Sequence, residues 1–271
     1  GLGNIGPEAA LPVMEGKCLL FKKFANIDAV PIVLNTQNTE EIISIVKAIS
    51  PTFGGINLED ISAPRCFEIE ERLKKELSIP VMHDDQHGTA IIILAGFLNA
   101  LKVVKKKMSE VKVVVSGAGA AGTAIVKIIL EAGVKNVLVV DKQGIIYKER
   151  NGLTPEKQKL ASITNHQNKQ GKIEDAFLGA DVFIGVSGPN LVTPEMIKAM
   201  NSNSIVFALA NPIPEIMPDI AIKAGAKVVA TGRSDFRNQL NNAQVIPGVF
   251  RGALDNKVLQ ITDAMKIKAA Y

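Results

Sequence analysis

The fold of this chain is decided by the stretch Lys112-Val-Val-Val-Ser-Gly117-Ala-Gly119-Ala-Ala-Gly122. Its first residues, Lys112–Val115, form an apolar run of the kind that predicts a buried strand. A glycine-rich turn follows, and Thr123–Ala132 then has apolar residues at helical spacing. A strand, such a turn and a helix in this order are the context in which the pattern G-x-G-x-x-G binds a dinucleotide.

Each glycine of this motif has its own physical role. Gly117 permits the tight turn, Gly119 lets the backbone approach a pyrophosphate, and Gly122 allows the helix to pack closely on the strand. The N-terminus of the helix offers free N–H groups and the positive end of the helix dipole to the phosphates, and Ala120 and Ala121 lie directly before it in the glycine-rich turn. We assign these five residues to a cofactor site; the alternative is a plain tight turn in an α/β sheet.

Asp141 extends the predicted site toward a ribose. It ends the next predicted strand, Asn136–Val140, at about the 20-residue distance from the glycine motif that this fold requires. A carboxylate there can accept hydrogen bonds from both ribose hydroxyls and repels a 2′-phosphate, so Asp141 favours NAD over NADP. The neighbouring Lys142 would offset part of this repulsion, which leaves NADP as the alternative cofactor.

Two further loops follow predicted strands, where ligands bind in parallel sheets. Val182–Val186 leads into Ser187 and Gly188, and Ile205–Leu209 leads into Ala210-Asn211-Pro212. We assign Ser187, Gly188 and Asn211 to the cofactor site. The alternative for each loop is ordinary turn chemistry, because Gly, Pro and Asn are common turn residues.

Short apolar runs alternate with helical patterns along the whole chain, which predicts an α/β fold with a mainly parallel sheet. A polar stretch, residues 147–172, is predicted to be a surface excursion. The other expected elements are the strands Ala29–Leu34, Phe53–Leu58, Ile79–Met82 and Lys227–Ala230, and the helices Thr39–Ile49 (with Thr39 as N-cap), Cys66–Leu77, Gly88–Val104 and about Lys257–Lys268.

Composition narrows the class of protein. The chain has 271 residues, which suits one large or two moderate domains of ~100–200 residues. The net charge is only +4 and aromatic residues make up 4%, so we expect no nucleic-acid partner. Cys18 and Cys66 give no disulfide framework, and no apolar run reaches the ~18 residues of a membrane span. We therefore expect a cytoplasmic protein with no membrane partner.

Two acidic pairs follow predicted strands. Glu59-Asp60 comes after Phe53–Leu58, and Asp84-Asp85 comes after Ile79–Met82. The carboxyl ends of parallel strands share one edge of a sheet, so these pairs can converge on one crevice. Several carboxylates around an open position suit Mg²⁺ or Mn²⁺. The alternative is that both pairs are solvated loop residues or helix caps.

Two histidines beside the second acidic pair raise a zinc site as a further alternative. The spacing of His83 and His87 suits two zinc ligands on one face of a helix. We expect both to lie outside a helix, because a predicted strand precedes His83 and Gly88 follows His87. Loop histidines therefore fit this pattern better than zinc ligands.

A resemblance to the malic enzyme family begins with the first residues, Gly1-Leu-Gly-Asn-Ile-Gly-Pro-Glu-Ala-Ala-Leu-Pro-Val-Met-Glu-Gly-Lys17, which are similar to the family's catalytic-lysine segment. The family's metal-binding segments are similar to Asn57-Leu-Glu59-Asp60 and His83-Asp84-Asp85-Gln-His-Gly88-Thr-Ala90. Its substrate- and cofactor-facing asparagines are similar to Ala210-Asn211-Pro212 and Asn241-Asn242. The matching segments run in the expected order, so the chain resembles the shorter prokaryotic-type malic enzymes over nearly its whole length.

The resemblance implies a role for each matching residue. Lys17 would contact the substrate and act as general base, for which burial and a nearby metal would have to lower its pKa from ~10.4. A divalent Mg²⁺ or Mn²⁺ would be ligated by Glu59, Asp60 and Asp85, with Asp84 beside them as a supporting group.

The implied reaction is the oxidative decarboxylation of L-malate to pyruvate and CO₂ with reduction of NAD or NADP. Asn211 and Asn242 would bind a malate carboxylate. The family's general acid is an upstream tyrosine, and neither Tyr147 nor Tyr271 matches its position. The chain also begins without Met, so we expect an N-terminal segment with that tyrosine to be missing from this sequence.

The resemblance also implies a domain organisation, partners and a set of alternative functions. We expect part of an α/β substrate- and metal-binding domain at residues 1–88, a doubly wound Rossmann-type NAD(P)-binding domain at residues 89–256, and a C-terminal helix at residues 257–271. The expected partners are a small molecule, malate or pyruvate, and a second copy in a homodimer. The alternatives are a malolactic-type or other related dehydrogenase, and a catalytically silent nucleotide-binding fragment.

Overall fold

The computed structural model describes residues 4–271, and backbone contacts divide the chain into two compact units. Unit 1 comprises Gly1–Ile92 and Asn242–Tyr271, and unit 2 comprises Ile93–Asn241. The sequence analysis assigned residues 242–256 to the nucleotide-binding domain, whereas their contacts group them with unit 1. The difference arises because this segment is apolar on one face and packs on the first helix of the chain, a contact between distant residues.

Unit 2 is built on a six-stranded sheet with the strand order β5-β4-β3-β6-β7-β8. All neighbouring strands are parallel except β5, which runs antiparallel to β4. The order reverses between β3 and β6, and this is where α/β sheets form their ligand crevice. The strands are β3 (Lys112–Ser116), β4 (Asn136–Asp141), β5 (Gly144–Ile145), β6 (Val182–Gly185), β7 (Ile205–Ala208) and β8 (Val228–Thr231).

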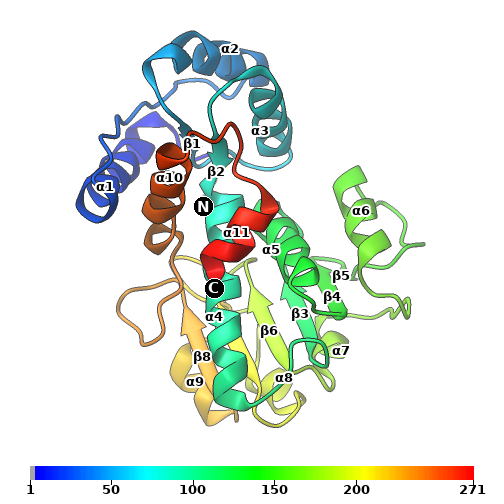
Figure 1. The fold of residues 1–271 in the computed structure, drawn as a ribbon. Helices are drawn as coiled ribbons and strands as arrows, with labels where there is room; N and C mark the ends of the chain where they lie inside the picture. The colour runs from blue at the N-terminus through cyan, green and yellow to red at the C-terminus, as the bar shows by residue number, and fades with distance from the viewer. Residues whose placement is uncertain (1–3) are drawn as a thin grey trace. The chain divides into compact units, whose positions relative to one another are not determined.

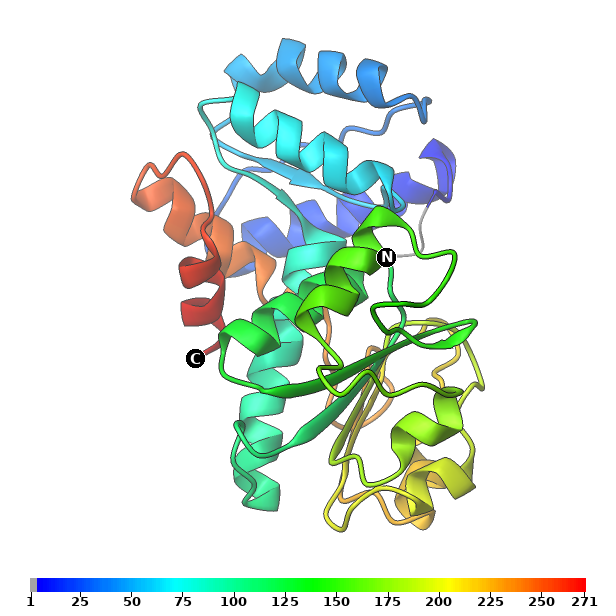
Figure 2. The ribbon, with the colours of Figure 1, turned by 90° about the vertical axis from the view of Figure 1, so that its right-hand side faces the viewer.

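Helices cover both faces of this sheet, which confirms the predicted doubly wound α/β class (Figure 2). One core cluster joins Val114, Phe183 and Val206 of the strands to α7, α8 and α9, and the rings of Phe177 and Phe183 lie 4.8 Å apart. The helices that begin and end in unit 2 are α5 (Ala120–Glu131), α6 (Pro155–Ile163), α7 (Ile173–Phe177), α8 (Pro194–Lys198) and α9 (Pro218–Lys223).

The predicted surface excursion at residues 147–172 is only partly at the surface. It contains α6, whose N-terminus is capped by the Thr154 side chain. Leu160 and Asn165 are buried, and the Asn165 side chain donates to the carbonyls of Ile146 and Lys169. The bond to Ile146 ties the segment to the residue that follows β5, an outcome that its polar composition did not indicate.

Unit 1 contains two short parallel strands, β1 (Ile56–Leu58) and β2 (Val81–His83), labelled in Figure 1. The helices α2 (Thr39–Ile49) and α3 (Arg65–Glu76) pack beside them. Their shared core is apolar and consists mainly of Ile42, Ile43, Val46, Leu58, Ile69, Leu73 and Val81. The bounds of α2 agree with the prediction, but its N-cap is Asn38, whose side chain accepts from the backbone of Glu40 at 2.9 Å.

The predicted strand Ala29–Leu34 is wrong, because these residues form neither a strand nor a helix. Val30 is 60% exposed and Ile32 is 39% exposed. Leu34 packs instead against the apolar cluster of α2 and α3. Half-buried and exposed side chains alternate here as in a strand, but within residues 4–271 no strand pairs with the segment.

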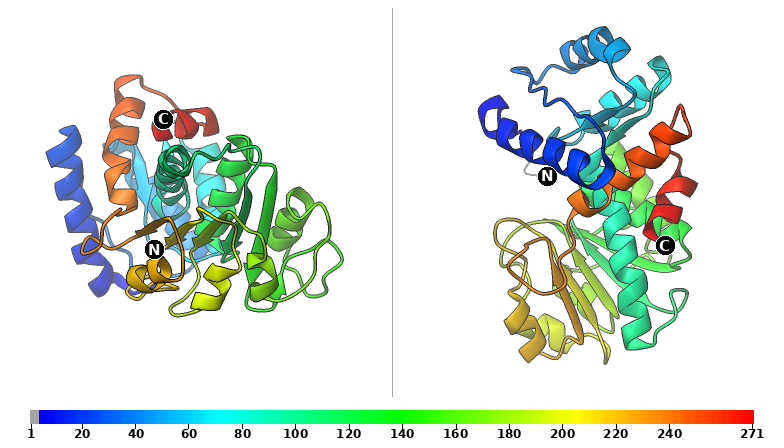
Figure 3. Two further views of the ribbon diagram at one scale, coloured as in Figure 1. Left: turned by 90° about the horizontal axis from the view of Figure 1, so that it is seen from below. Right: turned by 60° about the vertical axis from the view of Figure 1, so that its left-hand side comes forward.

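Three further helices belong to unit 1: α1 (Pro7–Ala25), α10 (Ile246–Asp255) and α11 (Asp263–Ala270). α1 lies beside α10, as both panels of Figure 3 show. The rings of Phe21 and Phe250 meet edge to face at a centroid distance of 5.6 Å. α11 begins later than predicted because Thr262 caps its N-terminus.

The helix α4 (Asp84–Val104) begins in unit 1 and ends in unit 2. Of the helices in residues 4–271, it has the length and hydropathy that could cross a membrane. Its side chains Ile91, Leu94 and Phe97 are fully buried within the protein, as in the core helix of a globular domain.

Candidate active site

The site of unit 1 lies where β1 and β2 end. The two strands are parallel, and Leu58 is opposite His83 in their register. The residues that follow, Glu59 and Asp84, therefore leave the strands at the same edge. The structure brings the two acidic pairs together at this edge, as the sequence predicts.

Three of the carboxylates form a candidate metal site. Ligand oxygens of Glu59, Asp60 and Asp85 all lie within 4.8 Å of one another. The Asp60 backbone, at a φ of 52°, donates to Asp85 Oδ2 at 2.9 Å, which holds the two residues in register. Burial, together with the charges of Asp84 and Asp85, raises the pKa of Glu59 to about 9. Oxygen ligands and concentrated negative charge suit a hard divalent cation such as Mg²⁺ or Mn²⁺.

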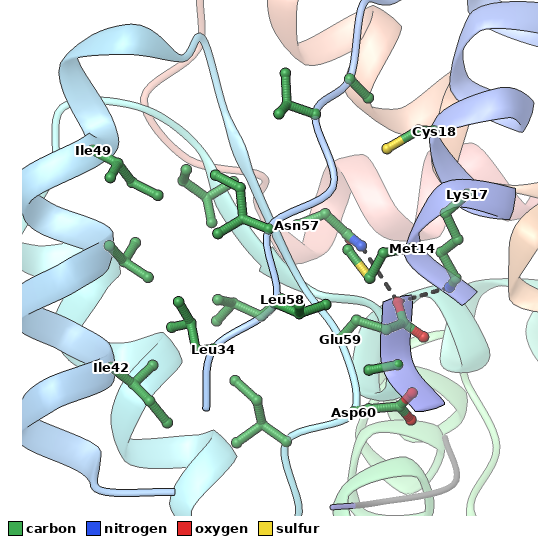
Figure 4. A pocket seen from close by; sticks show the side chains of 18 of the residues that line it. Met14, Lys17, Cys18, Leu34, Ile42, Ile49, Asn57, Leu58, Glu59 and Asp60 are labelled. Atoms are coloured by element: carbon green, nitrogen blue, oxygen red, sulfur yellow. Dashed lines mark hydrogen bonds and ion pairs between the residues drawn. The ribbon is translucent and has the colours of Figure 1, made fainter. Parts of the chain in front are cut away.

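Lys17 reaches this corner from α1. Its Nζ lies 2.7 Å from Glu59 Oε2 and is also paired with Asp84 Oδ2. Figure 4 shows the Lys17 and Asn57 side chains meeting the Glu59 carboxylate. Burial lowers the pKa of Lys17, but the charges of Asp84 and Glu59 outweigh burial and raise it above its usual value. A lowered pKa of Lys17 is expected with a metal nearby and stays a prediction, and its pairing with Glu59 and Asp84 has no signal in the sequence.

The helix α4 begins directly after β2, at Asp84, and its N-terminal turn carries both aspartates. A Cβ on Gly88 would lie 1.9 Å from Asp84 Oδ1 and 3.1 Å from the Cβ of Asn242. Gly88 therefore lets the side chain of Asp84 and the turn η2 (Asn242–Gln244) approach the helix closely. Asn242 thus lies near the carboxylates.

The two histidines lie in different elements, and neither belongs to the carboxylate trio. His83 ends β2, whereas His87 lies inside α4, so the expectation that both are non-helical is wrong for His87. Burial lowers the pKa of His83 to about 4. His87 Nε2 lies 2.9 Å from the buried carboxylate of Glu70, which also accepts from the backbone N–H of His83 at 3.0 Å.

Glu70 is a residue that the sequence analysis missed. It lies in α3 between Ile69 and Leu73, on the face that the helix buries. An acidic residue on an otherwise apolar helix face is a signal that could have identified it. Burial opposes its charge, but the hydrogen bond from His87 and the charge of Lys74 lower the pKa of Glu70 to about 2.

A cavity of about 560 Å³ opens beside these carboxylates within unit 1. Its polar end is formed by Lys17, Asn57, Glu59 and Asp60, and apolar residues of α1, α2 and the segment 27–37 form the rest of its lining. Figure 4 shows the labelled polar side chains gathered at one end. Such a cavity is large enough for a small dicarboxylate beside a cation.

The glycine motif of unit 2 has the geometry that a dinucleotide requires. Gly117 has a φ of 113°, and a Cβ there would lie 2.6 Å from the carbonyl oxygen of Val186. A Cβ on Gly122 would lie 1.8 Å from the carbonyl oxygen of Gly117, so helix and turn are in contact. Open space surrounds Gly119, the N-cap of α5, where a pyrophosphate would approach the helix.

Asp141 ends β4, as predicted, and is held by two cations. Arg150 donates to Asp141 Oδ1 at 2.9 Å, and Lys157 donates to Oδ2 at 2.6 Å. Burial opposes the charge of the carboxylate, but these hydrogen bonds lower the pKa of Asp141 to about 2. The sequence analysis considered Lys142 as the neighbouring cation and missed Arg150 and Lys157, because both follow in a polar stretch without a motif.

The remaining predicted residues are divided between the units. Ser187 and Gly188 follow β6, and Asn211 follows β7, all in unit 2. Ser187 Oγ lies 2.9 Å from the hydroxyl of Ser116 at the end of β3. Asn242, the other predicted substrate residue, belongs to unit 1.

Comparisons with known proteins identify close relatives. The family model described as malic enzyme, NAD binding domain, matches residues 86–271, and the model described as malic enzyme, N-terminal domain, matches residues 1–74. The chain is 59% identical over 270 residues to the NAD-dependent malic enzyme of Geobacillus stearothermophilus, with 100% of this chain and 56% of the relative covered. It is 57% identical over 270 residues to the bifunctional malic/malolactic enzyme of Bacillus subtilis (strain 168), with 99% and 66% covered.

A solved structure agrees with these sequence matches. The crystal structure of an NAD-dependent malic enzyme from Thermotoga maritima has a TM-score of 0.96 at 55% sequence identity, and the match covers 100% of this chain and 72% of that chain. Other relatives are described as NADP-dependent malic enzymes. The chain spans 56% and 66% of the length of the two curated relatives described above.

Two glycine substitutions separate folding from cofactor binding in unit 2. We expect Gly122→Ala to lower the unfolding midpoint strongly, because its Cβ would overlap the Gly117 carbonyl oxygen. Gly119→Ala has space for its methyl group and should leave the unfolding midpoint within experimental error. It should nevertheless weaken NADH binding at least tenfold, because the methyl group occupies the approach of the pyrophosphate. Chemical denaturation and NADH fluorescence measure both effects, and unchanged NADH binding in Gly119→Ala would rule out this turn as the phosphate site.

Proposed function

This chain belongs to the malic enzyme family, and we propose that its activity is the oxidative decarboxylation of L-malate to pyruvate and CO₂, with NAD or NADP as oxidant and Mg²⁺ or Mn²⁺ as the metal. The observation that carries the proposal is the pairing of Lys17 with Glu59 and Asp84 beside the carboxylate trio. A proton-accepting amine next to a candidate metal site is what oxidation of an α-hydroxy acid needs.

Each of the predicted site residues has its own part in the proposed reaction. Glu59, Asp60 and Asp85 would hold the divalent cation. A bound cation would draw electron density from the malate hydroxyl and from the carboxylate beside it, and the nicotinamide would accept the electron pair that leaves C2. Lys17 Nζ would take the proton of the C2 hydroxyl, and Asn211 and Asn242 would bind a malate carboxylate.

The protonation state of Lys17 depends on the charge around it. The charge of Asp84, together with the pairing of Lys17 with Glu59, raises the pKa of Lys17 and favours its ammonium form. A cation bound by Glu59, Asp60 and Asp85 would compete with Lys17 for the carboxylates and add positive charge nearby, and both effects would lower the pKa of Lys17. The base would therefore become available only when the metal site is filled.

Lys17→Ala tests the role of the base. In the full-length protein we expect malate oxidation to fall by ~10²–10⁴-fold, the usual contribution of a positioned acid–base group. Mn²⁺ affinity should remain close to that of the parent, because Lys17 is not one of the proposed ligands. Lys22→Ala is the matched control, since Lys22 lies on the same helix with its side chain 55% exposed. Turnover by Lys17→Ala within a fewfold of the parent would assign Lys17 a structural role.

Asp85→Asn tests the metal site. The substitution keeps the size of the side chain but removes a charge, so we expect Mn²⁺ affinity to fall at least tenfold, about 1.4 kcal/mol. Asp255→Asn should have no effect, because the Asp255 side chain is 57% exposed and pairs with Arg251. Isothermal titration of Mn²⁺ measures both. Loss of metal binding in His87→Ala, with full binding in Asp85→Asn, would favour a zinc-type site instead.

We propose NAD as the preferred cofactor, because Asp141 ends β4, the strand that follows the glycine motif, and a carboxylate at that position can accept from the ribose hydroxyls of NAD. The preference is moderated by Arg150 and Lys157, which neutralise this carboxylate and could themselves receive a 2′-phosphate. Both NAD- and NADP-dependent relatives are similar to the chain.

Asp141→Ser tests the choice of cofactor. The substitution removes the acceptor for the ribose hydroxyls and releases Arg150 and Lys157 from their partner. We expect the ratio of NAD⁺ to NADP⁺ affinity to fall at least tenfold in direct binding measurements. Asp219→Ser is the control, because the Asp219 side chain is 65% exposed. Equal losses for the two cofactors would mean that Asp141 is not at the ribose.

A malolactic activity is the second candidate, and one observation favours it: the relative from Bacillus subtilis is named a bifunctional malic/malolactic enzyme. Product analysis distinguishes the two reactions, since malic activity yields pyruvate with reduced cofactor, and malolactic activity yields lactate without net reduction. If the protein binds NADH but shows no Mn²⁺-dependent binding of malate, the result supports neither reaction. A nucleotide-binding role is then the one that remains.

A further inference from the structure

Glu215 is a buried carboxylate that none of the proposed steps uses. It lies in unit 2, after β7 and the segment Ala210-Asn211-Pro212, and is 0% exposed. Burying a carboxylate is unfavourable unless hydrogen bonds replace its water. Its contacts therefore indicate what it holds in place.

Both oxygens of Glu215 accept hydrogen bonds from backbone at the ends of two strands. Oε1 accepts from the backbone N–H of Ser187 at 2.9 Å and lies 3.3 Å from the Ser187 hydroxyl. Oε2 accepts from the backbone N–H of Ala210 at 3.0 Å. One side chain thus joins the loop after β6 to the loop after β7.

The surroundings of Glu215 are built to fit its side chain. A Cβ on Gly185 would lie 2.4 Å from the Glu215 carboxyl carbon, so only a glycine fits beside Glu215 at the last position of β6. The Glu215 carbonyl accepts from the backbone of Val192 at 3.0 Å, which fixes its own segment. The Ser187 hydroxyl continues the network to Ser116 of β3 at 2.9 Å.

The location of these loops suggests a function for the network. β3 and β6 flank the point where the strand order reverses, and the loops there form the ligand crevice of an α/β sheet. The glycine motif after β3 and Asp141 after β4 serve the adenosine and pyrophosphate side of a dinucleotide. The loops after β6 and β7 would therefore face the nicotinamide half of the cofactor.

We propose that Glu215 is a positioning residue for the nicotinamide half of the cofactor, acting through the backbone of Ser187 and Ala210. The inference rests on the proposed function insofar as that function requires a nicotinamide dinucleotide. A carboxylate is needed because it accepts at both oxygens, whereas the amide of a glutamine would direct an NH₂ group at one of the two N–H donors.

The test compares two ligands that share the adenosine, the pyrophosphate and the adjoining ribose. NADH carries a nicotinamide and ADP-ribose does not, and titration calorimetry measures their affinities for the parent and for Glu215→Gln. We expect NADH affinity to fall at least tenfold and ADP-ribose affinity to change less than twofold. Glu131→Gln is the matched control, because Glu131 is an exposed glutamate at the end of α5 in the same unit.

Amide exchange supplies a second measurement that does not depend on ligand. In Glu215→Gln the backbone N–H of Ser187 or of Ala210 should exchange faster than in the parent, while the N–H groups within β3 are unchanged. Should Glu215→Gln fail to fold, Glu215→Asp keeps the charge but shortens the reach, and the same selective loss of NADH affinity is expected.

Three outcomes would overturn the inference. Equal losses for NADH and ADP-ribose would mean that Glu215 supports unit 2 as a whole, and unchanged NADH affinity would mean that it positions nothing at the cofactor. A parent that binds neither ligand would refute the proposed cofactor itself, and the inference with it. This last result is distinguishable because it appears before any substitution is made.

Discussion

The parallel pairing of β1 with β2 is the constraint on which the candidate active site depends. Leu58 lies opposite His83, so Glu59 and Asp84 emerge from the two strands at one edge. A pair of three-residue strands has little stability of its own, and the apolar core between α2 and α3 holds it in place. A shift of one residue in the register would turn the carboxylates to the opposite face. The chemistry of unit 1 is therefore a consequence of apolar packing away from the site.

The same pairing concentrates negative charge in a buried corner. Burial and the neighbouring aspartates raise the pKa of Glu59 to about 9, and Lys17 is the cation that compensates them in the described part of the chain. Carboxylates this close are unfavourable without a counter-charge. A divalent cation that binds only the folded state would stabilise the protein by mass action. The carboxylates that would hold a metal therefore also weaken unit 1 unless positive charge compensates them.

Both units hold the ends of their strands with a buried glutamate. In unit 1, Glu70 accepts from the backbone N–H of His83 at 3.0 Å, directly before Asp84. In unit 2, Glu215 accepts from Ser187 and from the backbone of the loop after β7. Strand ends leave N–H groups without ladder partners, and a buried carboxylate satisfies them while fixing the segment that carries the candidate site residues. The two glutamates shape the sites from outside the recognisable motifs.

The sequence by itself determined the α/β class, the glycine turn at Gly117 and the position of the acidic pairs at strand ends, because periodicity and turn chemistry are local properties. The role proposed for Lys17 comes from the resemblance to a family, and not from the spacing of residues. Only the tertiary structure decided which side chains meet: Lys17 pairs with Asp84 across 67 residues of sequence, and Ser187 with Glu215 across 28. Such contacts depend on the register and packing of elements that are distant in the sequence, and no short stretch of sequence predicts them.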